Sequence, residues 1–264
     1  FWIKFLSYIN LAGTIHALIQ AMVLLLTRRG NRRANKVMAL FLMALAVGMA
    51  NGVLSLLGLY EIAPLLVVIM GAIALAYGPL FYLYIRAMTL PDRPGVPADV
   101  LHGVPFFLGI LVYGVHRGSP SGGPFLPGII GWAVGHPWVV VTVMSVLQTA
   151  AYVALVIRLL RAYSARIKET FSTIDRINLV WLRRRLAVYA AIWVIALVMI
   201  AAAGFEGRAL GLFMQIVAFL TALNIFATGY RAMRQAEVVL GPAAVPPGKR
   251  YERSSLSAEN SAQY

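Results

Sequence analysis

Cysteine is absent from the 264-residue chain, and Asp and Glu together number only nine. Without cysteine the chain has no disulfide, no thiolate metal ligand and no cysteine nucleophile. It also lacks His-Glu-x-x-His, Gly-x-Ser-x-Gly, phosphate-loop and dinucleotide-binding motifs. No acidic residue falls in the middle of an apolar segment, although proton pumps and intramembrane carboxylate enzymes depend on such groups. We therefore expect a protein that is not an enzyme and that binds no cofactor or metal.

Charged residues of both signs make up only 12% of the chain, whereas 61% of the residues are apolar. Soluble domains contain about a quarter charged and about half apolar residues, and the mean hydropathy here is +0.80. The net charge of +14 would indicate nucleic-acid binding only if the basic residues formed one water-exposed surface. They lie instead between apolar segments. We interpret the chain as an integral membrane protein that has lipid as a partner.

Seven apolar segments are long enough to cross a bilayer, because a membrane core requires about 20 residues of helix. The sequence therefore predicts an all-α, polytopic transmembrane bundle of seven helices. The predicted spans are residues 5–27, 37–59, 62–86, 99–116, 137–160, 184–204 and 209–230.

Lysine and arginine are distributed very unevenly between the two sides of this bundle. Twenty of them fall in the first, third and fifth loops and in the C-terminal tail, and three fall on the other side. Positively charged loops stay in the cytoplasm, so the N-terminus is predicted outside and the C-terminus inside. Residues 1–235 would form the transmembrane domain, and residues 236–264 a cytoplasmic linker to a further domain.

Two segments between the predicted spans have a composition of their own. The outer segment 117–136 is rich in Gly and Pro and contains an apolar stretch, Phe125 to Val134. This stretch predicts either a lid or a short element at the membrane surface. The inner segment 158–185 has apolar residues at spacings of three and four, as in an amphipathic helix. We expect it to extend the fifth span into the cytoplasm and to return along the membrane surface.

A few polar side chains fall at membrane depth, where they bond to another helix or line a cavity. His16 is the only histidine near the middle of a span, and Gln20 follows four residues later on the same helical face. Interhelical hydrogen bonding is the more common role of such residues, and a ligand pocket is the alternative. Asn51, Gln148 and Gln215 would join the pocket if the first, second, fifth and seventh spans converge.

Two glycine-containing motifs predict how the second and third spans are shaped. Gly48 and Gly52 form a Gly-x-x-x-Gly pair, which favours close packing within the bundle over a homodimer contact. Tyr77-Gly78-Pro79 should kink the third span, because proline removes one backbone hydrogen bond and crowds the preceding turn. Gly78 and Pro79 are therefore hinge candidates.

Three stretches of the sequence share a specific pattern with one known family. They are Tyr77 to Thr89 (YGPLFYLYIRAMT), Asn178 to Arg183 (NLVWLR), and a tail with YRAMRQ, a proline-bearing linker and KRYERSSLS. In these stretches the chain resembles membrane-anchored transcriptional regulators of the AraC type. The resemblance extends over nearly the whole chain as a general pattern.

The resemblance implies a sensory membrane domain in a bacterial inner membrane. In the family this domain precedes a helix-turn-helix domain that binds DNA, and we expect that domain to lie beyond Tyr264. The expected function is relay of an unidentified signal to this cytoplasmic output domain. The alternative is a structural or accessory subunit that packs with a membrane protein partner in a larger complex.

Overall fold

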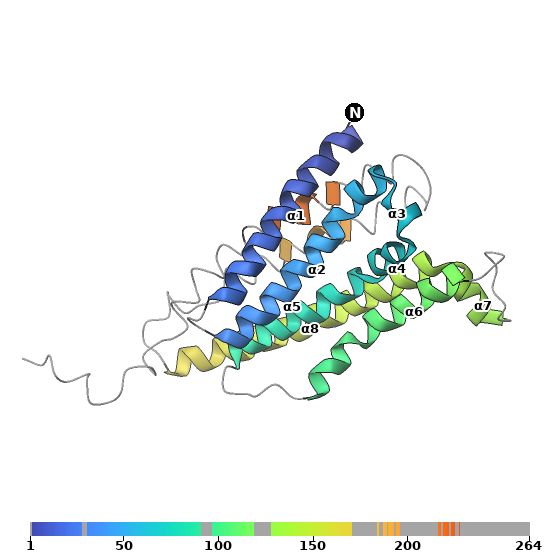
Figure 1. Cartoon of the computed structure of the whole chain (residues 1–264). Coiled ribbons are helices and arrows are strands. Elements are labelled where there is room, and N and C mark those ends of the chain that lie inside the picture. Colours follow the sequence, from blue (N-terminus) through green and yellow to red (C-terminus); the bar gives the residue numbers. More distant parts are fainter. Residues whose placement is uncertain are drawn as a thin grey trace, which may run out of the picture.

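The computed structural model describes most of the chain up to Thr170 and scattered positions after it (Figure 1). The described residues are 2–27, 31–90, 97–118 and 128–170, with single positions or short runs between 184 and 227. Within these ranges the secondary structure is helical and contains no strand. The all-α prediction is thus confirmed for this part of the chain.

Four helices of the described part are long and apolar enough to cross a membrane. These spans lie in α1 (Trp2–Leu26), in α2 (Arg32–Leu56), in the continuous helix formed by η1 (Pro97–Gly103) and α6 (Val104–Gly118), and in α8 (Pro137–Thr170). A fifth span results if α4 (Pro64–Ala72) and α5 (Ala74–Thr89), which meet at a bend of 48°, cross together.

The first five predicted spans each correspond to one of these helices or to the bent pair. The helix ends differ from the predicted ones by a few residues, as in α2, which begins at Arg32 rather than at residue 37. The sixth and seventh predicted spans, residues 184–204 and 209–230, lie largely outside the described residues. Every position that is described within them is helical.

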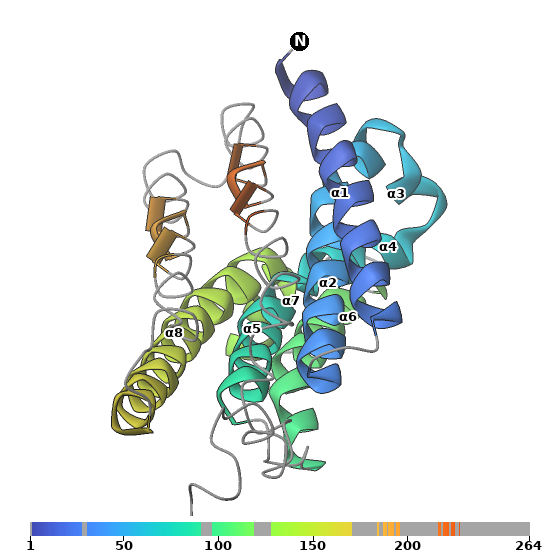
Figure 2. The ribbon, with the colours of Figure 1, turned by 90° about the vertical axis from the view of Figure 1, so that its left-hand side faces the viewer.

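The described helices pack in a row with the order α1, α2, α5 and α8. Figure 2 shows α1 and α8 on opposite sides, with α2 and α5 between them. Among the described elements α1 contacts α2 alone, and α4 leaves the row to pack mainly on α6. The two halves of the third span, α4 and α5, therefore pack mainly against different helices.

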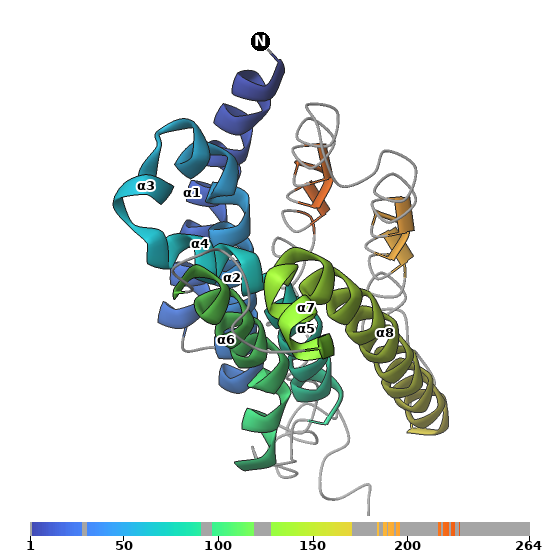
Figure 3. The same ribbon diagram turned by 90° about the vertical axis from the view of Figure 1, so that its right-hand side faces the viewer.

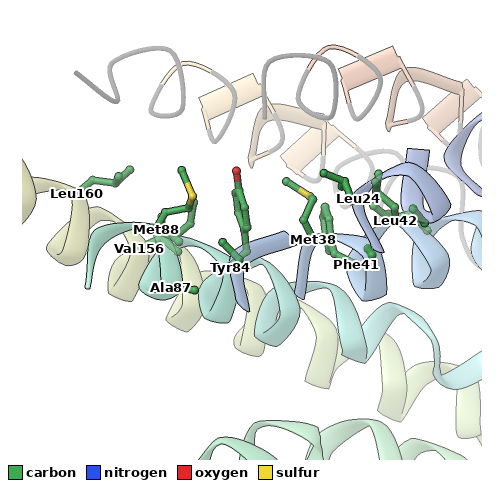
Figure 4. Close-up of a cluster of buried hydrophobic side chains, with 14 residues drawn as sticks. Leu24, Met38, Phe41, Leu42, Tyr84, Ala87, Met88, Val156 and Leu160 are labelled. Carbon is green, nitrogen blue, oxygen red and sulfur yellow. The ribbon is translucent and has the colours of Figure 1, made fainter. Parts of the chain in front are cut away.

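A cluster of buried apolar side chains lies where the end of α1, the first half of α2, the end of α5 and the middle of α8 meet, and we refer to this region as the packed end (Figure 4). Lipid chains are as apolar as these side chains, so close packing rather than exclusion of water stabilises the contact. The buried residues of the cluster include Leu24, Met38, Leu42, Tyr84, Ile85, Met88, Val156 and Leu160.

Asn31 determines where α2 begins and attaches it to α5. Its side-chain oxygen accepts a hydrogen bond from the N–H of Ala34 at 3.0 Å, as an N-cap residue does. Its side-chain nitrogen donates to the carbonyl of Ala87 near the end of α5 at 2.7 Å. One side chain therefore satisfies a free N–H of one helix and a carbonyl of another.

The 34 residues of α8 make a helix of about 51 Å at about 1.5 Å per residue. The bilayer core is about 30 Å thick, and even a tilt of about 40° leaves α8 longer than that. The helix predicted for the fifth span thus continues as far as Thr170, and its extension into the cytoplasm stays a prediction. The predicted return along the membrane lies outside the described residues.

Candidate functional site: the broken third span

The third span is bent, but the break between α4 and α5 lies at Ile73, four residues before the Tyr77-Gly78-Pro79 stretch at which the sequence predicted a kink. Pro79 itself lies inside α5. Proline disturbs the carbonyl four residues before it, which is that of Leu75, so the break lies two residues further towards α4. We call residues 72–79 the helix joint.

Pro79 leaves the carbonyl oxygen of Leu75 without its usual donor, since a regular helix would supply the N–H of residue 79. Gln148 of α8 replaces that donor, and its Nε2 donates to the Leu75 oxygen at 2.7 Å. An unpaired carbonyl in hydrocarbon is strongly unfavourable. Gln148, which the sequence suggested as a pocket residue, is therefore an interhelical hydrogen-bond donor at the helix joint.

Glycines allow tyrosine side chains to contact the backbone of α5 and of its neighbour α2. A Cβ added at Gly48 of α2 would overlap the hydroxyl oxygen of Tyr77. A Cβ added at Gly78 would lie 3.0 Å from Cδ2 of Tyr152, which belongs to α8. Gly48 thus packs within the bundle, and α5 is fitted closely against both α2 and α8.

The other half of the span is fitted against α6 in the same way. The ring of Tyr113 on α6 lies over Gly71 of α4, where any Cβ would overlap it. A Cβ at Gly109 of α6 would lie 2.8 Å from Cδ1 of Leu75 on α5 and 3.1 Å from the Cβ of Ala72 on α4. Two units therefore meet at the helix joint, α4 mainly with α6 and α5 mainly with α2 and α8, and Leu75 of α5 also contacts α6.

Asp99 is the centre of a polar cluster at the packed end. Its carboxylate pairs with Arg33 of α2 at 2.7 Å and with Arg86 of α5. A partly buried charge is stable only when it is paired, so these contacts attach the beginning of η1 to the beginning of α2 and the end of α5.

Three aromatic rings extend the polar cluster to α8. The ring nitrogen Nδ1 of His102 is hydrogen-bonded to the hydroxyl of Tyr152 at 2.7 Å. The ring of Tyr82 lies 5.3 Å from that of His102 and 5.6 Å from that of Tyr152, and the guanidinium of Arg86 lies 5.9 Å from its centre. Because Tyr152 also contacts Gly78, it connects the polar cluster to the helix joint.

The structure brings His16 and Gln20 together, as their spacing on one helical face predicted. The Gln20 amide nitrogen lies 2.8 Å from Nε2 of His16. Gln20 is only 4% exposed, whereas His16 lies on the exposed side of α1. The hydroxyl of Thr14 donates to the carbonyl of Ala46 at 3.4 Å. Residue 14 of α1 therefore lies beside residue 46 of α2.

Asn51 lies away from this pair. In the antiparallel register given by Thr14 and Ala46, Asn51 is separated from His16 by about 10 Å along the helices, at about 1.5 Å per residue. Its side-chain oxygen accepts a hydrogen bond from Tyr60 of α3 (Leu59–Ile62). Burial raises the pKa of Tyr60 above its ordinary value.

The predicted pocket residues are thus divided among several places in the part that the structure describes. The pair on α1 is separated from Gln148 on α8 by α2 and α5. Gln215 lies outside the described residues.

The ion pairs of Asp99 were not anticipated from the sequence. The signal for them was present: Asp99 begins one predicted span, and Arg86 ends the preceding one, so a short connection holds opposite charges near one membrane boundary. The contacts of Tyr113 and Tyr152 had no comparable signal, since aromatic residues are frequent throughout the chain.

No family model, curated protein or solved structure matches the chain. The function is therefore argued from its own residues and their geometry.

Gly48→Ala should lower the free energy of unfolding by about 1–3 kcal/mol, because the new methyl group overlaps the hydroxyl of Tyr77. In a Tyr77→Phe background the same substitution should be far less destabilising, since the next ring atom lies 3.4 Å away. Unfolding in mixed detergent micelles, followed by circular dichroism, measures both values. Gly114→Ala is the control, because no atom lies within 4 Å of a Cβ there. Equal destabilisation in the two backgrounds would contradict the proposed overlap.

Gln148→Leu should lower the free energy of unfolding by about 1–2 kcal/mol, because it leaves the Leu75 carbonyl unpaired. In a Pro79→Ala background the effect should nearly vanish, since the introduced alanine would supply the missing N–H. A double-mutant cycle in the same unfolding assay measures this coupling, with Gly114→Ala as the uncoupled background. Additive effects within about 0.5 kcal/mol would show that Gln148 does not compensate for the proline.

Proposed function

We propose that the chain is the membrane-embedded sensory module of an AraC-type transcriptional regulator in a bacterial inner membrane. It relays a signal from the bundle to a cytoplasmic helix-turn-helix domain that binds DNA and lies beyond Tyr264. The resemblance of three stretches to that family supports the proposal, and the geometry of the helix joint supports it independently.

The proposed topology has seven spans within residues 1–235, with the N-terminus outside. Residues 184–204 and 209–230 form the sixth and seventh spans, and residues 236–264 form the cytoplasmic linker. The support is the set of four or five described helices of spanning length, together with the excess of Lys and Arg on one side of the chain.

The helix joint is the observation that carries the proposal. α4 packs mainly on α6, whereas α5 packs on α2 and α8, so a signal that displaces α4 changes the bend at Ile73. Two residues of α8, Gln148 and Tyr152, contact the joint directly. Because α8 is longer than the membrane core is thick, a change at the joint has a continuous helix along which it reaches the cytoplasm.

The free energy that this relay requires is modest. A ligand shifts an equilibrium between two bends only by the difference in its affinity for them. Coupling between distant sites is typically about 1–3 kcal/mol, which corresponds to about 5-fold to 150-fold in affinity. One interhelical hydrogen bond of the kind that Gln148 makes has an energy of this order.

A structural or accessory subunit of a larger membrane complex is the second candidate function. The polar cluster favours it, because the ion pairs of Asp99 with Arg33 and Arg86 hold η1, α2 and α5 in one fixed arrangement. In that case the bend at Ile73 is a fixed shape that fits a membrane protein partner.

Transcript levels in the source strain should distinguish these functions. Deletion of the gene should change a set of transcripts, and Pro79→Ala should change the same set by about five-fold at unchanged membrane abundance. Gly114→Ala is the control and should leave the transcripts as they are. The reading frame after the Tyr264 codon should encode about 100 further residues with two helix-turn-helix motifs. If deletion of the gene leaves the transcripts unchanged but removes other proteins of a complex from the membrane, the function as an accessory subunit is favoured.

The proposed topology predicts the location of reporter fusions along the chain. Fusions after Gly122 and Gly207 should report an external location, and fusions after Gly95, Thr173 and Gly248 a cytoplasmic one. Paired alkaline phosphatase and green fluorescent protein reporters measure the two sides. A cytoplasmic signal after Gly122 would contradict the combination of an external N-terminus with four preceding spans.

A further inference from the structure

α7 (Gly128–Gly135) is a short helix between the end of α6 and the beginning of α8, and it contacts both (Figure 3). Its outward side carries Ile129, Ile130 and Trp132, which are 82%, 60% and 52% exposed. The sequence contains no charged residue between Arg117 and Arg158. A water-soluble surface rarely concentrates such side chains.

The opposite side of α7 is attached to the bundle. Gly131 and Val134 are buried, and the carbonyl of Val134 accepts a hydrogen bond from Nδ1 of His116 on α6 at 2.9 Å. This arrangement fixes which side of α7 faces outward.

The position of α7 relative to the membrane follows from the two helices that it joins. α6 ends at Gly118, and only His136 separates α7 from the beginning of α8. Both helices contain candidate membrane spans, so α7 lies where they meet the membrane boundary. It is therefore at the depth at which interfacial helices bind lipid.

One end of α7 has the side chains that suit this boundary. The rings of Trp132 and His136 are stacked with centres 5.1 Å apart, and Nδ1 of His136 donates to the carbonyl of Trp132 at 2.9 Å. Both residues combine an apolar ring with a polar atom, as is typical of residues between acyl chains and head groups.

We propose that α7 is an interfacial lipid-binding helix, with Ile129, Ile130 and Trp132 inserted among the acyl chains of the leaflet that borders the end of α6. Insertion depends on apolar contact rather than on head-group charge, because α7 has no charged side chain. This inference is independent of the proposed function, since a sensor and an accessory subunit would both keep it.

A nitroxide spin label measures the depth directly, because the chain contains no other cysteine. Ile129→Cys and, separately, Ile130→Cys are labelled in nanodiscs of phosphatidylcholine, and collisions with oxygen and with a water-soluble nickel chelate are compared. Val143→Cys, exposed within the span of α8, is the lipid reference, and Ala165→Cys, exposed where the candidate span of α8 ends, is the water reference. Val134→Cys, on the buried side of α7, is the control for a label covered by protein.

Both α7 labels should be more accessible to oxygen than to the chelate, with a depth about 5–10 Å inside the head groups. Replacing half of the phosphatidylcholine by phosphatidylglycerol should leave that depth unchanged. Chelate accessibility equal to that at Ala165→Cys would show that α7 faces water. Low accessibility to both reagents, as at Val134→Cys, would show that a second copy or another part of the chain covers it. Either result overturns the proposal.

Discussion

Every backbone carbonyl in a membrane core needs a hydrogen-bond donor, and the arrangement of α4, α5 and α8 follows from this constraint. Pro79 removes the donor that would serve Leu75, and lipid cannot replace it. Gln148 supplies a donor from another helix. The position of α8 beside the third span therefore compensates for the hydrogen bond that Pro79 removes.

The same bundle is held differently on the two sides of the helix joint. At the packed end, buried apolar side chains, the ion pairs of Asp99 and the bond between His102 and Tyr152 hold α2, α5, η1 and α8 together. Beyond Ile73, α4 packs chiefly on α6. Because α5 beyond the joint is closely packed against α2 and α8, a movement of α4 relative to α5 changes the structure mainly at the helix joint.

The sequence predicted those parts of the fold that depend on local composition. Membrane thickness sets the length of apolar segments, so the first five predicted spans coincide with four long apolar helices and one bent pair. Pro79 indicated a bend in the third of them, although the break lies at Ile73. The partner of Gln148 could not be predicted in this way. An amide at membrane depth can bond to any helix, and only the three-dimensional arrangement shows that Leu75 is the carbonyl within its reach. The separation of His16 from Gln148 likewise depends on the order in which the helices pack.

The distance between the beginning of α4 and the extension of α8 tests whether the helix joint couples the two units. Nitroxide labels at Leu65→Cys and Arg161→Cys, both exposed, allow that distance to be measured by double electron–electron resonance in nanodiscs. α4 has nine residues, or about 13 Å, so a change in bend of about 20° moves its far end by about 5 Å. We expect Gln148→Leu to shift or broaden the distance distribution by about this amount, and Gln148→Leu combined with Pro79→Ala to give a single narrow distribution. Identical distributions in the native chain and in both variants would contradict coupling through the joint.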